Sequence, residues 1–147
     1  MLPCKCIINM KKTLDTPAVV TTETRNVLPK VSIVTPSYNY GRFIEKTITS
    51  VLEQGYPNLE YFIIDGQSTD HTIDVVRKYE QCLTGWISEP DHGAADAIEK
   101  GRSRCTGELF NWLNADDYLL PEALKSLGEI AKQFPQFDIY AFLNIGE

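Results

Sequence analysis

Short apolar segments alternate with amphipathic helical segments from Val31 onward, and this alternation constrains the fold more than any other feature. The apolar segments predict strands at 31–35, 59–64, 83–88, 109–113 and 137–143, with Pro36 ending the first. Helical patterns lie between them at about 43–52, 70–79, 93–105 and 121–134. Strands joined by helices need crossover connections, which make the strands parallel and put helices on the sheet's faces. The sequence therefore predicts an α/β fold of three layers, α/β/α, around a mainly parallel sheet.

The chain is long enough for one domain, or part of one, with a real core. It has 147 residues, of which 43% are hydrophobic and 23% are charged, as in ordinary globular proteins. The net charge of −6 argues against a nucleic-acid partner. Residues 1–30 show no sustained periodicity, so we expect a poorly ordered N-terminal extension before a domain at 31–147.

The sequence carries no sign of a membrane span or of a secretory leader. No apolar stretch approaches spanning length, and the first ten residues lack a basic segment followed by an apolar core. The four cysteines form no disulfide or metal pattern. We therefore expect a cytoplasmic protein, with a peripheral position at the inner face of the membrane as the alternative.

Residues 108–117 join an apolar strand pattern to an amide and two adjacent carboxylates. We expect this strand to be buried, so that Asn114, Asp116 and Asp117 emerge together where it leaves the sheet. Crowded carboxylates repel each other unless a cation, a hydrogen-bond donor or water compensates, and oxygen ligands of this kind suit Mg²⁺ or Mn²⁺. The alternative is an acidic, solvated turn before the helix that Pro121 begins.

Most of the small polar and acidic clusters fall in loops that follow predicted strands, at 35–39, 65–70, 89–93 and 114–117. Because the carboxyl ends of parallel strands share one edge of the sheet, these loops should converge there, where ligands bind. Connections at the opposite edge, such as 54–58, are plain turns. No glycine-rich dinucleotide fingerprint or P-loop is present, and neither histidine accompanies a nucleophile-elbow sequence.

Five ordered motifs carry a family resemblance. They are VSIVTPSYN (31–39), IIDGQSTD (63–70), WISEPDHG (86–93), DAIEKG (96–101) and TGELFNWLNADD (106–117). From about Val31 to Ile139 the chain resembles the N-terminal part of the family 2 glycosyltransferases, and among them bacterial enzymes that build cell-surface polysaccharides. The resemblance implies the nucleotide-binding half of a GT-A, Rossmann-like fold. It also implies a nucleotide-sugar donor, UDP-linked, and inverting transfer to a glycan or lipid-linked acceptor.

The same resemblance implies roles for the nucleotide-binding residues. Pro36, Ser37 and Tyr38 would shape the nucleoside pocket, with Tyr38 near the base, and Asp65 would accept a hydrogen bond from uracil. Asp96 would line the sugar pocket. Each role has an alternative. Tyr38 could simply pack on the sheet edge, Asp65 could be a turn residue before Gly66, and Asp96 could have a helix-start role.

Asn114-Ala115-Asp116 occupies the place of the family's D-x-D motif, so the resemblance implies a metal site there. Asp116 would be the best ligand of Mg²⁺ or Mn²⁺, Asp117 would support the metal cluster, and Asn114 would face ribose or a metal-bound water. The chain departs from the family pattern where Asn114 replaces an aspartate and where Glu99 replaces an asparagine. The first change should weaken ion binding. The second, together with His92 where Lys or Arg is frequent in the family, puts affinity for a diphosphate in doubt.

The family's general base is expected beyond Glu147, so no catalytic residue is assigned, and we interpret the domain as truncated at its C-terminus. The alternative function is a non-catalytic remnant, or a nucleotide-binding module that lacks the base. A half-sheet would also leave a strand edge uncovered, which predicts self-association.

Overall fold

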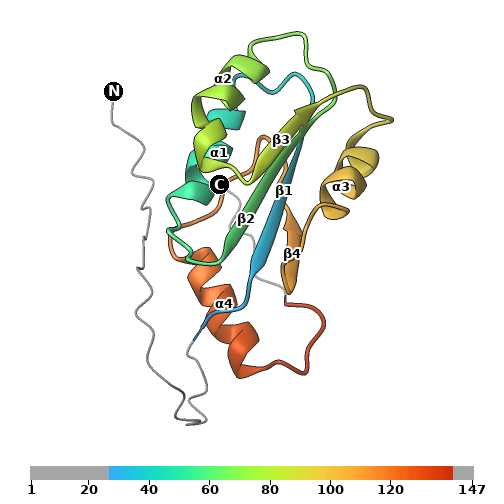
Figure 1. The fold of residues 1–147 in the computed structure, drawn as a ribbon. Coiled ribbons are helices and arrows are strands. Elements are labelled where there is room, and N and C mark those ends of the chain that lie inside the picture. The colour runs from blue at the N-terminus through green and yellow to red at the C-terminus, as the bar shows by residue number, and fades with distance from the viewer. Residues whose placement is uncertain (1–26, 141–147) are drawn as a thin grey trace, which may run out of the picture.

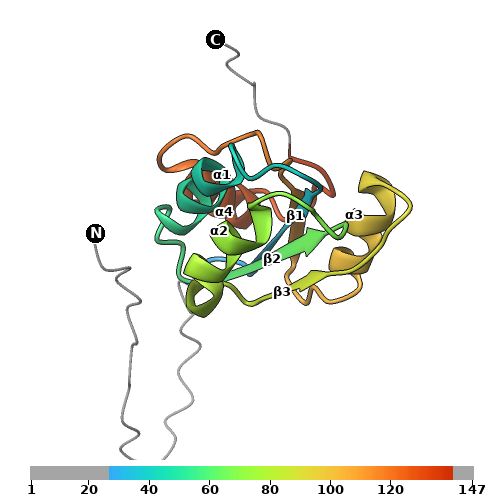
Figure 2. The same cartoon turned by 90° about the horizontal axis from the view of Figure 1, so that it is seen from above.

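A four-stranded parallel sheet in the order β3-β2-β1-β4 forms the centre of the computed structural model, which describes residues 27–140. The elements are β1 (Val31–Ser37), α1 (Ile44–Leu52), β2 (Leu59–Asp65), α2 (Thr72–Tyr79), a 3₁₀ turn (Glu80–Cys82), β3 (Gly85–Ser88), α3 (Ala94–Arg102), β4 (Leu109–Trp112) and α4 (Ala123–Gln133). Figure 2 shows α1, α2 and α4 on one face and α3 on the other. The predicted α/β/α layering is confirmed.

The strands run in one direction, so the loops that leave their carboxyl ends share an edge. β1 pairs along its whole length with β2, and its first four residues pair with β4. β2 pairs with β3 from Phe62↔Gly85 to Asp65↔Ser88. The loops after β1, β2 and β3 lie together at the upper end of the sheet in Figure 1. This edge holds the residues that the sequence marked as candidates.

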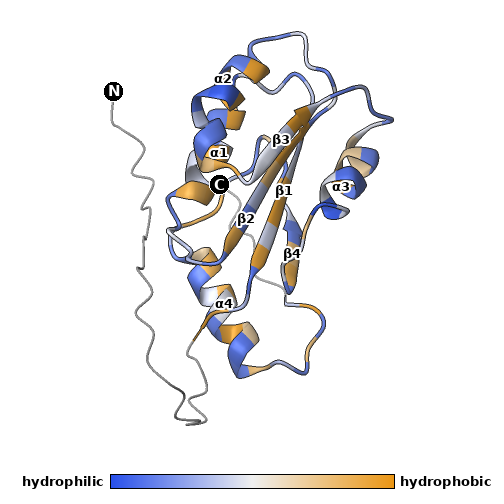
Figure 3. Ribbon diagram, in the orientation of Figure 1, coloured by the Kyte–Doolittle hydropathy of each residue, from blue (hydrophilic) through white to orange (hydrophobic). Residues whose placement is uncertain are grey.

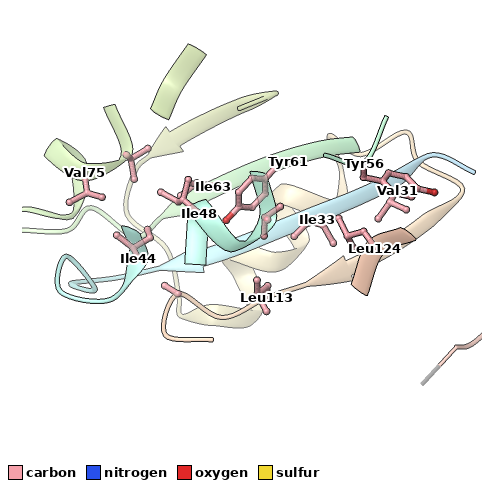
Figure 4. Close-up of a cluster of buried hydrophobic side chains, with 13 residues drawn as sticks. Val31, Ile33, Ile44, Ile48, Tyr56, Tyr61, Ile63, Val75, Leu113 and Leu124 are labelled. Carbon is pink, nitrogen blue, oxygen red and sulfur yellow. The ribbon is translucent and has the colours of Figure 1, made fainter. Parts of the chain in front are cut away.

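The larger core lies between the sheet and α1, α2 and α4. Ile44, Ile48 and Val51 share one face of α1, and all three are fully buried. Figure 4 shows Ile44 and Ile48 with strand residues such as Ile33 and Ile63, and Figure 3 shows the apolar colouring of the strands. Burial of this set supplies the main driving force for folding.

The smaller core lies under α3 and depends on a close helix–strand approach. Ala97 of α3 packs with Val34, Phe62 and Ile64 of the sheet. A Cβ atom added to Gly101 would lie 2.4 Å from Val34 Cγ1, which is nearer than atoms can approach. The absence of a side chain at Gly101 therefore lets α3 lie directly on β1.

Pro36 does not end the first strand, which is a correction to the prediction. In a parallel pair the backbone groups of successive residues point to alternate neighbours. Val34 O accepts from Leu113 N, beyond the end of β4, and Ser37 O accepts from Gly66 N on the β2 side. The backbone groups of Pro36 therefore face the β4 side of the sheet, at a position beyond the last β1–β4 pair. Its missing N–H leaves no ladder bond unmade.

β4 is not the buried strand that the sequence predicted. It lies at one side of the sheet among the described strands, and α3 covers β1 and β2 instead. Phe110 and Trp112 are consequently 37% and 50% exposed. An apolar run alone does not distinguish a central strand from an edge strand.

Two further predictions need correction. Within the described residues the proposed fifth strand is absent, since 137–140 has no strand, and 141–143 lies outside them. Phe43 and Phe134, which the predicted helices at 43–52 and 121–134 include, lie just outside α1 and α4 as cap residues and are exposed. Residues 1–26 of the expected extension also lie outside the described residues. Just after them, Pro29 O accepts a hydrogen bond from Tyr56 Oη at 2.7 Å.

Candidate functional site

A cleft of about 520 Å³ opens at the carboxyl edge of the sheet. Its walls come from the end of β1 and the segment after it (Pro36, Ser37, Tyr38, Tyr40), from the β3–α3 connection and α3 (Asp91, Gly93, Ala94, Ala97) and from the turn after β4 (Asn114, Ala115, Asp116). This volume is typical of small-molecule sites. The structure thus brings together five of the predicted residues, whereas Asp65, Asp96 and Asp117 do not line the cleft.

Ser37 brings an unsatisfied hydroxyl group to the cleft wall. The residue is only 4% exposed, and its Oγ is the one buried side-chain polar atom without a hydrogen-bond partner among residues 27–140. Buried polar groups are nearly always paired, with protein, water or ligand. Because this atom has almost no solvent-accessible surface, a bond from it to a molecule in the cleft requires the hydroxyl to turn toward the cleft that Ser37 lines.

Tyr38 stands beside this hydroxyl with its ring largely uncovered. Its side chain is 57% exposed, so it does not pack on the sheet edge, which was the alternative interpretation. A ring that lines a cleft and is free on one side offers a stacking surface for a planar group.

The acidic turn after β4 is held by a residue that the sequence analysis missed. Thr47 is buried on α1, and its Oγ1 lies 2.9 Å from Ala115 O and 2.7 Å from Asp117 O, so one hydroxyl proton is shared between two carbonyls. Asn114 Nδ2 also donates to Asp117 Oδ2 at 3.0 Å. The available signal was a threonine on an otherwise apolar helix face.

The turn leaves Asp116 free to bind a cation. The Asp116 side chain is exposed and lines the cleft, and no hydrogen bond or ion pair within residues 27–140 engages its carboxylate. No group of three or more His, Cys, Asp or Glu residues in this part of the chain could hold an ion by itself. One carboxylate and the amide oxygen of Asn114 suit a Mg²⁺ or Mn²⁺ ion that takes its other ligands from phosphates and water.

Asp65 is fully buried and bonded within the protein. Its Oδ2 accepts from Ser68 N at 2.8 Å and from Ser88 Oγ at 2.7 Å, and its Oδ1 accepts from Ser68 Oγ. These bonds join the loop after β2 to the end of β3. A contact between Asp65 and uracil stays a prediction.

Asp96 supports the β3–α3 connection rather than the cleft surface. Its Oδ2 accepts from His92 N at 3.1 Å and lies 3.5 Å from Lys100 Nζ. The His92 N–H, followed by the Lys100 ammonium, lowers the pKa of Asp96. Lys100 also bonds Pro90 O at 2.9 Å, so the connection is fastened to α3.

The sequence position of Glu99 suggested that its carboxylate would disfavour a bound diphosphate, but the structure pairs this carboxylate elsewhere. Its carboxylate pairs with the Arg102 guanidinium through two hydrogen bonds of 2.8 and 2.7 Å. It does not line the cleft. The negative charge is therefore neutralised locally and does not oppose a diphosphate directly.

A family model described as glycosyl transferase family 2 matches residues 32–145. The chain is 40% identical over 95 residues to TuaG of Bacillus subtilis (strain 168), whose name assigns it to teichuronic acid biosynthesis; the match covers 63% of this chain and 38% of TuaG. It is 34% identical over 102 residues to the hyaluronan synthase of Pasteurella multocida, covering 68% of this chain and 10% of that enzyme.

Two solved structures also match this chain. S. aureus TarS 1–349 in complex with UDP-GlcNAc matches with a TM-score of 0.67 and 25% identity over 72% of this chain and 32% of that one. The mannosyltransferase PcManGT from Pyrobaculum calidifontis, in complex with GDP-Man and Mn²⁺, matches with a TM-score of 0.63 and 28% identity over 74% and 33%. The chain thus spans about a third of the length of these structures. None of the helices between residues 27 and 140 has the length and apolar composition of a membrane span.

Proposed function

The chain belongs to glycosyl transferase family 2, and on that premise we propose that its cleft binds a nucleotide-sugar, UDP-linked, together with Mg²⁺ or Mn²⁺. The bound sugar would pass with inversion to a glycan or lipid-linked acceptor. In this proposal residues 31–147 are the donor-binding part of a glycosyltransferase domain.

One observation carries the proposal: a single cleft gathers an orphan hydroxyl, an uncovered aromatic ring and a free carboxylate. Ser37, Tyr38 and Asp116 supply these three groups from β1, the loop after it and the turn after β4. A nucleoside diphosphate has matching parts, namely polar sugar or base atoms, a planar base and a charged diphosphate. The complexes of TarS with UDP-GlcNAc and of PcManGT with GDP-Man support a ligand of this class.

The metal would be held by Asp116, with the Asn114 amide oxygen or a water beside it. A divalent ion supplies charge that offsets the negative charge of a departing diphosphate. The chain's own residues perform the positioning: Thr47 holds the turn by two backbone carbonyls, and Asp117 orients the Asn114 amide. The Mn²⁺ bound with GDP-Man in PcManGT supports this choice of ion.

The proposal is tested by calorimetric titration of UDP with and without Mn²⁺. The Asp116→Asn variant should lose Mn²⁺-dependent binding, since it loses the free charge while keeping the side-chain shape. Asp74→Asn is the matched control, because this exposed carboxylate on α2 does not line the cleft. Equal Mn²⁺ dependence in wild type and Asp116→Asn would refute the assigned metal site.

A second candidate function is nucleotide binding without transfer. The described cleft holds only two carboxylates, Asp91 and Asp116, and Asp91 Oδ1 already accepts a hydrogen bond from Gly93 N at 2.8 Å. The first proposal assigns the general base to no residue of this cleft. Release of sugar from a UDP-sugar by this chain would exclude the second candidate, whereas UDP binding with no release would favour it.

A further inference from the structure

Asn39, the residue after Tyr38, holds the loop after β2 with its side chain. Its backbone is left-handed, with φ of +60°. In that conformation Asn39 Oδ1 accepts hydrogen bonds from Thr69 N at 2.8 Å and from Asp70 N at 3.3 Å. Asparagine tolerates this backbone region better than other residues with a side chain, and it adds an acceptor.

The backbone of Asn39 is tied to the same loop by a second route. Asn39 N donates to Ser68 Oγ at 2.7 Å, and the Ser68 hydroxyl donates in turn to Asp65 Oδ1. Asp65 is fully buried and is fixed from the other side by Ser88 Oγ. A chain of hydrogen bonds therefore runs from the ends of β2 and β3 to Asn39.

The residues two positions before and after Asn39 are fastened as well. Ser37 O accepts from Gly66 N at 2.8 Å, and Gly41 N donates to Asp70 Oδ2 at 3.0 Å. Every second residue from 37 to 41 is thus bonded to the loop after β2. Tyr38 lies between two of these fixed points while its own ring is mostly exposed. Its position over the cleft depends on the backbone.

We propose that Asn39 is a positioning residue, which holds Tyr38 in place to stack on the base of the bound nucleotide. The inference rests on the proposed function, because it assumes that a nucleotide occupies the cleft. Pre-organisation of the ring removes part of the ordering cost of binding. The loop after β2, which does not line the cleft, takes part in recognition through Asn39.

Calorimetric titration of UDP into Asn39 variants tests this role. Asn39→Ala should bind UDP roughly tenfold more weakly, because it loses both the acceptor and the residue suited to positive φ. Asn39→Asp keeps both features, so its UDP affinity should stay within about threefold of wild type. Asn39→Gly keeps only the backbone freedom, so its UDP affinity should lie between those of Asn39→Ala and Asn39→Asp. Gln67→Ala is the matched control, since Gln67 also has positive φ (63°), is exposed and does not line the cleft.

The decisive comparison repeats Asn39→Gly and Asn39→Ala in a Tyr38→Ala background, with thermal unfolding measured for each variant. If Asn39 acts through Tyr38, its substitution has no further effect on UDP affinity once the ring is absent. An equal loss of affinity in both backgrounds would overturn the inference, as would unchanged affinity in Asn39→Gly and Asn39→Ala. Failure of the wild type to bind UDP would instead overturn the proposed function, and this inference with it.

Discussion

At the scale of single residues, Glu60 shows how the fold stabilises a buried charge. It is 8% exposed at the start of β2, where its carboxylate pairs with Lys30 Nζ at 2.5 Å. It also accepts from Ser32 Oγ at 2.7 Å and from both the amide and the hydroxyl of Thr106. Burial raises the pKa of Glu60, but these hydrogen bonds outweigh it and lower the pKa to about 2.

The depressed pKa of Glu60 predicts an acid-dependent loss of stability. Since the folded pKa lies below the ordinary value of 4.5, the stabilisation is fully present above about pH 4.5 and is lost as pH falls toward 2. We expect a loss on the order of 2 kcal/mol after solvent screening is allowed for. Urea unfolding of wild type and Glu60→Gln at pH 6 and pH 3 measures it. A stability difference that is the same at both pH values would contradict the prediction.

Ser37 and Ser32, two buried serines of β1, should respond oppositely to alanine. Ser37→Ala removes an unpaired hydroxyl, so the free energy of unfolding should stay the same or rise by up to about 1 kcal/mol, while UDP affinity falls about three- to tenfold. Ser32→Ala removes a hydroxyl bonded to Glu60 and to Gly107 N, so stability should fall and UDP affinity should not. Chemical unfolding and calorimetry on both variants give the four values. Reduced stability with unchanged UDP affinity in Ser37→Ala would show that its hydroxyl serves the fold.

At the scale of elements, α1 connects the core to the acidic turn. Its apolar face packs on the sheet, while Thr47 on that face bonds the carbonyls of Ala115 and Asp117. A helix that is fixed in the core can therefore set the position of Asp116 between those two residues. The alignment of core and site explains why a hydroxyl is retained among Ile44, Ile48 and Val51.

Replacement of Thr47 by valine should affect both stability and metal binding. The change preserves shape but leaves two carbonyls without their donor, so we expect a loss of about 1–3 kcal/mol in unfolding free energy. Mn²⁺-dependent UDP binding should weaken as the turn loosens. Thr49→Val is the matched control, because Thr49 Oγ1 bonds only carbonyls of its own helix. Equal effects of the two substitutions on metal-dependent binding would contradict the role given to Thr47.

Elements could be predicted from the sequence where local pattern decides them. The apolar runs located four strands, and the 3.6-residue periodicity located four helices, because both signals arise within a few neighbouring residues. Strand order is set by contacts between distant segments. For that reason the exposure of Phe110 and Trp112 on β4, and the tolerance of Pro36 inside β1, were missed.

The residues of the candidate site also divide into those that the sequence pattern could predict and those that it could not. Ser37, Tyr38 and Asp116 could be predicted because they leave parallel strands at one edge of the sheet. Thr47 and Asn39 could not, since their partners lie about 70 and 30 residues away in the sequence. Contact between Asp65 and uracil stays a prediction. The bond from Ser88 to Asp65 was not foreseen, because it depends on the pairing of β2 with β3.

At the scale of the whole molecule, the described sheet has a ligand-sized cleft at its carboxyl edge and exposed aromatic side chains on β4. The cleft lies at the carboxyl edge, and Phe110 and Trp112 lie exposed on β4. The relatives and solved structures it matches are longer, since the chain covers 38% or less of each of the four compared above. Self-association through an uncovered strand edge stays a prediction from the sequence.

The central claim is that the cleft binds a nucleoside diphosphate through Tyr38 and a divalent ion at Asp116. The most direct test is a crystal structure grown with UDP and Mn²⁺, with diffraction data that record the anomalous signal of manganese. We predict an anomalous peak in contact with the Asp116 carboxylate and the diphosphate, with uracil against the Tyr38 ring. Nucleotide bound outside this cleft, or manganese away from Asp116, would contradict the account.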